Sequence, residues 1–214
     1  MNPKTTVAIP LYKSAKFIDT ITNNIKAISL DDVEILISDR HCLDDTIDRL
    51  AEKFKNDKRI RFLKAKDEID WVDHINELLK EAKGKYFRFL PHDDYSTEGS
   101  LENLINVLDT NEDAIVAYGG IIRVNQKGEP IDKEIMNLPS SGEKPYQWTL
   151  DVALKMYWKI YFHHSFKGLI RMKPVIENNL FIEKTSDTIY SDTCWRFALC
   201  LLGKFIYVPD SVLI

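Results

Sequence analysis

Short apolar runs alternate along the first 120 residues with stretches in which apolar residues recur every three or four positions. The runs are rich in β-branched and aromatic residues and predict five strands. These strands are Thr5–Ile9, Val33–Ile37, Arg59–Leu63, Tyr86–Leu90 and Ala114–Tyr118. The periodic stretches predict four helices, over residues 15–28, 44–54, 70–82 and 101–108. Strands separated by helices are joined by right-handed crossovers, so the pattern predicts an α/β fold with a mostly parallel central sheet flanked by helices.

Individual residues predict where these elements begin and end. Pro10 is expected to end the first strand. Asp44 opens the second helix with an acid, as the helix dipole favours. Asp70 is a candidate N-cap for the third helix, whose apolar stripe begins at Trp71, and Gly84 is expected to stop that helix.

The pattern changes after Gly120. Asn125–Gly128 predicts a hairpin turn, and residues 137–147 are rich in Pro, Ser, Gly and Lys, which predicts a loop. Residues 148–166 are dense in aromatics that share a helical face, a pattern more typical of a core than of a ligand site. A last helix is predicted from about Asp192 to Leu202, followed by a strand over 204–208.

Composition places the chain among ordinary globular domains. Its 214 residues are 44% hydrophobic and 29% charged, which fits one α/β-sized domain. A net charge of −4 implies no broad basic face, so nucleic acid is not expected as a partner. The N-terminus has no apolar signal-peptide core and no run is long enough to span a membrane, so the chain is expected to be cytoplasmic.

The cysteines and glycines exclude several kinds of site. Three cysteines without a C-x-x-C pair argue against a disulfide framework or a structural zinc site. The sequence lacks both G-x-G-x-x-G and the Walker A loop, which disfavours dinucleotide oxidoreductases and P-loop kinases. A bound nucleotide would therefore need another way to neutralise its phosphates.

Acidic residues follow two of the predicted strands, at Asp39 and at Asp93–Asp94. Ligands of open parallel sheets bind outside the carboxyl ends of the strands. A divalent metal held by one or two carboxylates can neutralise a diphosphate, and Asp93 and Asp94 are candidates to hold one. The alternative is that both are solvated turn residues before the next helix.

Six motifs in this order resemble family 2 glycosyltransferases, which have the GT-A fold. Their spacing resembles that of the family, and together they extend over nearly the whole chain. In chain order the motifs are Ala8–Tyr12, Ile37–Asp39 with Asp44–Thr46, Asn76 to Tyr86, Phe89–Asp94, Gly168–Arg171, and Ser191–Asp192 with Trp195–Arg196. Three positions depart from the family pattern. Pro91 stands where the first acid of the metal motif is usual, Arg40 replaces an acid after Asp39, and Ser191 replaces the Glu of the Glu-Asp motif.

The resemblance implies an inverting, metal-dependent glycosyltransferase. Asp192 would be the catalytic base, Asp93 would hold Mg²⁺ or Mn²⁺, and a UDP-sugar is the default donor. The implied donor-binding residues are Pro10, Tyr12, Asp39, Asn76, His92, Asp93 and Asp94. The implied acceptor-binding residues are Trp158, His164 and Arg171. For Tyr12, Asn76 and His92, the alternatives are packing, capping and a solvent-facing ring, respectively.

The resemblance also implies how the chain is organised. Residues 1–214 would be a single GT-A domain, with a nucleotide-sugar-binding half over 1–120 and an acceptor-binding half over 121–214. Residues 137–147 are a candidate lid over the donor. Expected partners are a nucleotide sugar and a carbohydrate or lipid-linked carbohydrate of polysaccharide synthesis. Such an acceptor is compatible with peripheral attachment of the protein at the inner face of a membrane.

A competing interpretation is a non-catalytic donor-binding or scaffold module, which the departures at Pro91 and Ser191 favour. A nucleotidyltransferase is disfavoured, because Pro10–Ser14 supplies no Gly-rich loop.

Overall fold

The structure is a computed structural model that describes residues 3–40, 44–125, 127–131, 147–148, 164–186 and 188–214. Within these residues the strands form one eight-stranded sheet of order β3-β2-β1-β4-β7-β5-β8-β6. The strands are β1 (Thr5–Leu11), β2 (Val33–Asp39), β3 (Ile60–Lys64), β4 (Tyr86–Phe89), β5 (Ala114–Ile121), β6 (Gln147–Trp148), β7 (Leu169–Arg171) and β8 (Lys204–Leu213). β7 and β6 run antiparallel to their neighbours and the other pairs are parallel, so the predicted mostly parallel α/β sheet is confirmed.

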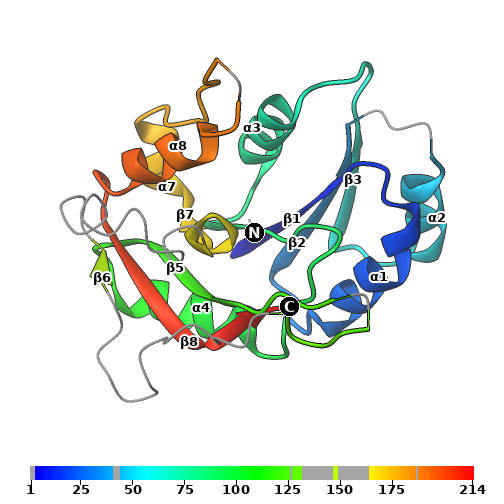
Figure 1. The fold of residues 1–214 in the computed structure, drawn as a ribbon, viewed down its shortest axis with the longest axis horizontal. Coiled ribbons are helices and arrows are strands. Elements are labelled where there is room, and N and C mark those ends of the chain that lie inside the picture. Colours follow the sequence, from blue (N-terminus) through cyan, green and yellow to red (C-terminus); the bar gives the residue numbers. More distant parts are fainter. Residues whose placement is uncertain (1–2, 41–43, 126, 132–146, 149–163, 187) are drawn as a thin grey trace.

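Helices cover both faces of this sheet (Figure 1). The described helices are α1 (Ile18–Ala27), α2 (Thr46–Lys53), α3 (Trp71–Glu81), α4 (Ser100–Thr110), α7 (Met172–Glu177) and α8 (Ser191–Leu199), with 3-10 turns η1 (Ala15–Phe17) and η2 (Ser165–Lys167). Apolar residues of α3, α7 and α8 pack in one core, and those of α1, α2 and α4 in a second. Adjacent strand residues alternate between them, with Ala8 in the first core and Val7 in the second. This period-2 alternation produces a three-layer α/β/α arrangement.

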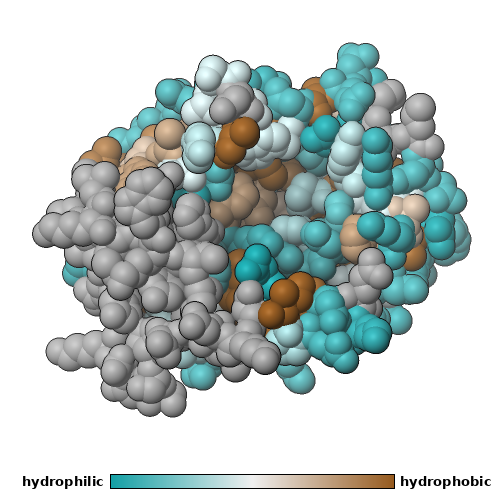
Figure 2. Space-filling view, in the orientation of Figure 1, coloured by the Kyte–Doolittle hydropathy of each residue, from teal (hydrophilic) through white to brown (hydrophobic). Residues whose placement is uncertain are grey.

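The surface seen in Figure 2 follows the same division. Hydrophilic residues cover most of the region of α1 and α2, whereas hydrophobic residues are visible in the hollow beneath α3 and α8. Within the described part of the chain, no helix is both long and apolar enough to cross a membrane.

The first half folds as its pattern predicts, with small differences at the ends of elements. Asp70 is the N-cap of α3, since its carboxylate accepts hydrogen bonds from the backbone N–H groups of Val72 at 2.8 Å and Asp73 at 3.0 Å. β1 continues through Pro10, which the sequence places at its end. The last hydrogen bond between β1 and β4 runs from the Leu90 N–H to the Ala8 carbonyl. Beyond it, no residue of β4 needs a hydrogen bond from the backbone nitrogen of Pro10, so proline is tolerated in the strand.

Gly84 has a different role from the expected helix stop. α3 ends at Glu81, and Ala82 is already extended. A Cβ atom at Gly84 would lie 2.4 Å from the backbone nitrogen of Thr6. The Gly84 N–H also donates to Thr6 Oγ1 at 2.9 Å. A glycine is needed here because the backbone approaches β1 too closely to leave room for a side chain.

The second half returns to the same sheet. The predicted hairpin turn is confirmed: the Gly128 N–H donates to the Asn125 carbonyl at 2.9 Å, and Val124 pairs with Pro130. β7 lies between β4 and β5, and neither it nor α7 is predicted by the pattern. α8 ends at Leu199, earlier than expected, and β8 is longer than expected. Most of the candidate lid, 137–146, lies outside the described residues.

Candidate active site

The carboxyl ends of β1, β2 and β4 meet at one edge of the sheet. β1 lies between β2 and β4, with Leu11 paired to Asp39 and Ala8 paired to Phe89. Asp39 is the last residue of β2, and the loops that leave β1 and β4 carry Tyr12 and His92–Asp94. The edge therefore brings together acids that lie more than 50 residues apart in the sequence, as expected for a ligand site in an open parallel sheet.

Asp39 is the buried last residue of β2, with 2% exposure. Its carbonyl accepts a hydrogen bond from the Ala65 N–H at 2.9 Å. The preceding residue, Ser38, has its Oγ 2.9 Å from Nε2 of His74 on α3. Burial, assisted by the charge of Arg40, lowers the pKa of His74 to about 4, so this histidine is neutral near pH 7.

Tyr12 and Arg40 form a cation–π contact next to Asp39. The guanidinium carbon of Arg40 lies 3.8 Å from the centre of the Tyr12 ring, which is 36% exposed. Within the described part of the chain, Arg40 Nε is buried and has no hydrogen-bond partner. The residue that departs from the acidic family pattern therefore places a positive charge against an exposed aromatic ring.

His92 is held in place by two side chains near the start of α1. Its Nδ1 lies 2.8 Å from Ser14 Oγ, and its ring stacks on Phe17 with centroids 4.7 Å apart. Ser14 is fully buried and also accepts a hydrogen bond from the Tyr12 N–H at 2.9 Å. His92 is thus a half-buried, oriented ring rather than a solvent-facing one, and Ser14 connects it to Tyr12.

Asp93 and Asp94 are adjacent in sequence but differ in environment. The Asp93 side chain is exposed, and no described residue forms a hydrogen bond or ion pair with its carboxylate. Asp94 Oδ2 lies 2.5 Å from Nζ of Lys167, which belongs to η2. Burial raises the pKa of Asp94, although the Lys167 ammonium opposes that shift. Asp94 is therefore committed to an ion pair, while Asp93 is open to a ligand.

This arrangement fits a divalent metal that is shared with a substrate. Mg²⁺ is commonly bound by one or two carboxylates together with substrate phosphates and water. The free carboxylate of Asp93 at the carboxyl edge supplies such a ligand. Among the described residues, no group of three or more His, Cys, Asp or Glu side chains forms a metal cage. The residues present thus fit Mg²⁺ or Mn²⁺ bound jointly with phosphate oxygens.

Asp192 lies in the first turn of α8 and is tied to a buried arginine. Nη2 of Arg196, whose side chain is 1% exposed, lies 3.0 Å from Asp192 Oδ2. The loop before α8 is connected to the start of α3, because Trp71 Nε1 donates to Thr188 Oγ1 at 3.2 Å. α3 begins directly after the loop that leaves β3, so its N-terminus and the start of α8 lie towards the same edge as Asp39 and Asp93.

An aromatic contact joins α8 to the end of β4. Phe166 of η2 stacks on Phe89 with centroids 5.1 Å apart, and it meets Trp195 edge-on at 6.1 Å. Together with the Lys167–Asp94 ion pair, this contact places η2 between α8 and the loop that carries His92–Asp94.

Asn76, an expected donor-binding residue, hydrogen-bonds to the backbone of Ile182. The Asn76 amide donates to the Ile182 carbonyl at 2.8 Å and accepts from the Ile182 N–H at 2.9 Å. Both ends of this amide are therefore used to fix the segment after α7, which agrees with the structural alternative rather than with the donor contact. Trp71, at which the predicted apolar stripe of this helix begins, donates its indole N–H to Thr188 Oγ1 and so fixes a loop.

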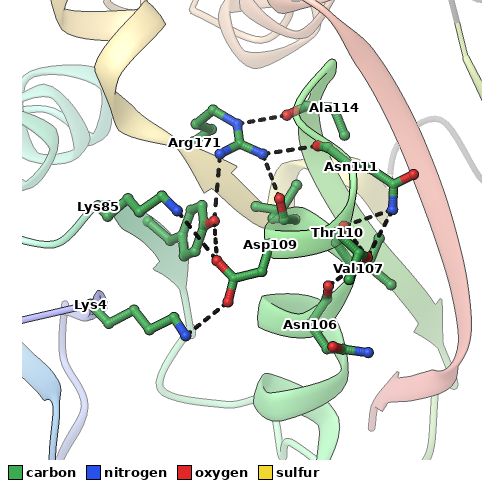
Figure 3. Close-up of polar contacts among 11 residues, drawn as sticks. Lys4, Lys85, Asn106, Val107, Asp109, Thr110, Asn111, Ala114 and Arg171 are labelled. Atoms are coloured by element: carbon green, nitrogen blue, oxygen red, sulfur yellow. Dashed lines mark hydrogen bonds and ion pairs between the residues drawn. The ribbon is translucent and has the colours of Figure 1, made fainter.

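Arg171 lies at the opposite edge of the sheet, because it pairs with Tyr86, the first residue of β4. Its guanidinium donates to three backbone carbonyls at and just beyond the C-terminal end of α4 (Figure 3), those of Leu108 at 2.6 Å, Asn111 at 3.0 Å and Ala114 at 2.9 Å. The expectation that Arg171 binds an acceptor is therefore corrected: this arginine satisfies carbonyls that α4 leaves without helical partners.

The other expected residues are placed as follows. Pro10 lies in β1 beside Ser38 of β2. His164 is buried directly before η2, with 8% exposure. Trp158 lies outside the described residues.

The structure adds Ser14 and Asn24 to the residues around the edge. Asn24 carries the clearest sequence signal, because it falls on the apolar face of its helix between Ile21 and Ile25. A polar residue on such a face needs hydrogen-bond partners when it is buried.

Comparisons with known proteins agree with this geometry. The family model described as glycosyl transferase family 2 matches residues 6–178. An uncharacterized glycosyltransferase of Haemophilus influenzae is 27% identical over 122 residues, 57% of this chain and 38% of that protein. A GalNAc(5)-diNAcBac-PP-undecaprenol beta-1,3-glucosyltransferase of Campylobacter jejuni is 26% identical over 183 residues, 85% of this chain and 56% of that protein. The chain thus spans between about two fifths and three fifths of these two relatives.

Solved structures share the fold at low identity. TarS of S. aureus in complex with UDP-GlcNAc superposes with a TM-score of 0.76 at 19% identity, covering 98% of this chain and 58% of that one. The mannosyltransferase PcManGT of Pyrobaculum calidifontis, in complex with GDP-Man and Mn²⁺, gives a TM-score of 0.65 at 14% identity, covering 100% of this chain and 56% of that one. The fold is therefore the GT-A fold expected from the motifs.

Proposed function

Since the chain belongs to glycosyl transferase family 2, we propose that it transfers a sugar from a nucleotide sugar to an acceptor hydroxyl with inversion at the anomeric carbon. One observation supports the proposal: the open carboxylate of Asp93 follows β4 at the sheet edge where β2 ends in Asp39. Asp192 is in the first turn of α8, and the loop before α8 contacts the start of α3. Such an edge can hold a donor between a metal-binding acid and a base.

UDP-sugar is the default donor, and Mg²⁺ or Mn²⁺ the default metal. TarS was solved with UDP-GlcNAc and PcManGT with GDP-Man and Mn²⁺, which supports a nucleoside diphosphate and a divalent ion for this chain too. Asp39 would accept a hydrogen bond from a base N–H, with Tyr12 beside the base. Arg40 contacts the same Tyr12 ring and carries a positive charge where the family pattern has an acid. Binding measurements with different nucleotides would show which base this arrangement selects.

The residues that follow β4 would act on the diphosphate part of the donor. Cleavage of the anomeric bond builds negative charge on the leaving diphosphate, which a metal ion on Asp93 would stabilise when bound. His92 and Asp94 lie on the same loop, and His92 would face the ribose or a phosphate. Lys167 compensates the charge of Asp94 and keeps it from repelling the diphosphate.

Asp192 would accept the proton of the acceptor hydroxyl. Arg196 fixes Oδ2 of Asp192, and the described residues offer no partner to Oδ1. One carboxylate oxygen is thus oriented and the other is open, as a general base requires. A positioned base contributes typically about 10²–10⁴-fold to such a transfer.

The acceptor is proposed to be a carbohydrate or a lipid-linked carbohydrate of polysaccharide or glycoconjugate synthesis. The printed name of the Campylobacter jejuni relative describes an undecaprenol-linked acceptor, which supports this class. Activity on such an acceptor would take place in the cytoplasm at the inner face of a membrane. Trp158 and His164 remain proposed acceptor contacts.

A second candidate function is a donor-binding module without transfer, which the structure around Ser191 favours. Ser191 Oγ accepts a hydrogen bond from the Thr185 N–H at 2.9 Å and lies 3.1 Å from Thr185 Oγ1. This serine, which replaces the Glu of the family motif, therefore holds a loop. The module would bind donor without turnover, and its binding would survive loss of Asp192.

Calorimetric titration with UDP, GDP, dTDP and CDP, each with Mn²⁺ and then with EDTA, tests the proposal. We expect metal-dependent binding of one nucleotide, followed by NMR detection of transfer or hydrolysis of its sugars with inversion. Binding without any turnover would favour the second candidate. No binding of any of the four by a folded chain would contradict both.

A further inference from the structure

Asn24 of α1 forms two hydrogen bonds to the loop that follows β4. Its Nδ2 donates to the Asp94 carbonyl at 2.7 Å, and its Oδ1 accepts from the Ser96 N–H at 3.1 Å. The side chain is 2% exposed, so these bonds form away from water. A buried amide that uses both ends in this way fixes the path of the backbone it contacts.

A buried arginine strengthens the same attachment. Arg88, in β4, is 3% exposed and donates to Ser96 Oγ at 3.2 Å and to Ser100 Oγ at 3.3 Å. Ser96 is therefore held by its backbone N–H and by its hydroxyl. A cavity of about 20 Å³, which is large enough for one water molecule, is lined in part by Asn24, Arg88 and Ser96.

Asp93 itself has no side-chain partner among the described residues, so its neighbours determine where it points. On one side, His92 is held by Ser14 and Phe17. On the other side, the backbone of Asp94 is held by Asn24 and its carboxylate by Lys167. The backbone of Asp93 is therefore anchored on both sides while its carboxylate is left open.

We propose that Asn24 is a positioning residue that acts through the Asp94–Ser96 backbone to hold the Asp93 carboxylate where a divalent metal bound to a donor diphosphate reaches it. This inference rests on the proposed function, because it assumes that Asp93 shares a metal with a nucleotide. In this role Asn24, which is 2% exposed, would act through the backbone and would not itself contact donor or metal. Its loss should weaken the use of metal more than it weakens the fold.

The experiment compares Asn24→Ala with two matched variants of the same helix. Asn23→Ala changes the adjacent, exposed asparagine. Thr22→Val changes a buried residue whose hydroxyl has no hydrogen-bond partner in the described part of the chain. The readouts are the Mn²⁺ concentration for half-maximal UDP binding, the exchange rate of the Ser96 amide hydrogen and the melting temperature.

Asn24→Ala should raise the half-maximal Mn²⁺ concentration about tenfold, the size expected for loss of a buried hydrogen bond. The Ser96 amide should also exchange faster, and neither change should appear in the two matched variants. Faster exchange with unchanged Mn²⁺ dependence would overturn the proposal. So would equal effects of Thr22→Val and Asn24→Ala, because they would reflect a general loss of helix packing.

A variant of similar size guards against misfolding. Asn24→Asp keeps the acceptor for the Ser96 N–H but loses the donor to Asp94, and it should also raise the Mn²⁺ requirement. If neither Asn24 variant folds while Thr22→Val does, Asn24 is a folding residue and the proposal fails. If the wild type binds UDP with Mn²⁺ and Asn24→Ala binds it identically, the inference alone fails. If the folded wild type binds no nucleotide, the proposed function itself fails and the inference with it.

Discussion

His74 and Ser38 join α3 to the end of β2, with Nε2 of the histidine 2.9 Å from Oγ of the serine. Ser38 directly precedes Asp39, so this buried contact supports the end of the strand that carries the candidate base-recognising acid. Burial, together with the charge of Arg40, lowers the pKa of His74 to about 4. The folded protein therefore disfavours the imidazolium because of burial and the Arg40 charge, and not because of the contact with Ser38.

Acid should destabilise the fold through His74. Between about pH 6.5 and about pH 4 the unfolded chain binds a proton that the folded chain excludes, so the free energy of unfolding falls as pH falls through this range. The full difference corresponds to about 3 kcal/mol at most. Urea unfolding at pH 7.5, 6, 5 and 4 measures it. His74→Gln should flatten the profile, and identical profiles of wild type and variant would contradict the prediction.

Asp93 and Asp94 should respond differently to amide substitution, because only Asp94 is committed to Lys167. Asp93→Asn should abolish the difference between nucleotide binding in Mn²⁺ and in EDTA, since it removes the open ligand. Asp94→Asn should weaken binding less, while keeping its dependence on Mn²⁺. Calorimetry on the two variants tests this prediction. The reverse order of effects would reassign the metal to Asp94.

Loss of the Asp192 carboxylate should separate binding from transfer. Asp192→Asn keeps the side-chain size and the hydrogen bond from Arg196 Nε to the Asp192 carbonyl, so donor binding should remain. Transfer should fall by about 10²–10⁴-fold, the contribution of a positioned base. Single-turnover assays and nucleotide titrations on the same preparation measure both. Turnover equal to that of the wild type would exclude Asp192 as the base.

The sequence predicts much of the sheet edge formed by the carboxyl ends of β1, β2 and β4, because the signals for these strands and their acids are local. Strands that end in Asp39 and Asp93–Asp94 are recognisable from short apolar runs followed by acids. Parallel strands must place their carboxyl ends together, so the meeting of these acids follows once the sheet is predicted. The family resemblance adds Asp192, which no local pattern connects to the edge.

Contacts between distant segments were not predictable in the same way. Asn76 and Arg171 match family motifs, yet the structure uses them to satisfy backbone groups of Ile182 and of the end of α4. A sequence shows a polar residue but not which buried N–H or carbonyl lacks a partner. β7 has three residues, which is too short for a periodic signal, so its antiparallel insertion beside β4 was also missed.

Arg171 should affect stability and leave the acceptor unaffected. Arg171→Met removes three hydrogen bonds to carbonyls at and just beyond the end of α4, and bonds from a charged donor contribute the most (Figure 3). The free energy of unfolding should fall by about 2–3 kcal/mol. Arg49→Met, which removes an exposed arginine with one loose ion pair at 3.8 Å, should change it by less than about 0.5 kcal/mol. Below the melting temperature of Arg171→Met, the KM for acceptor should equal that of the wild type. A selective rise of that KM without loss of stability would return Arg171 to the acceptor site, against its place at the far edge of the sheet.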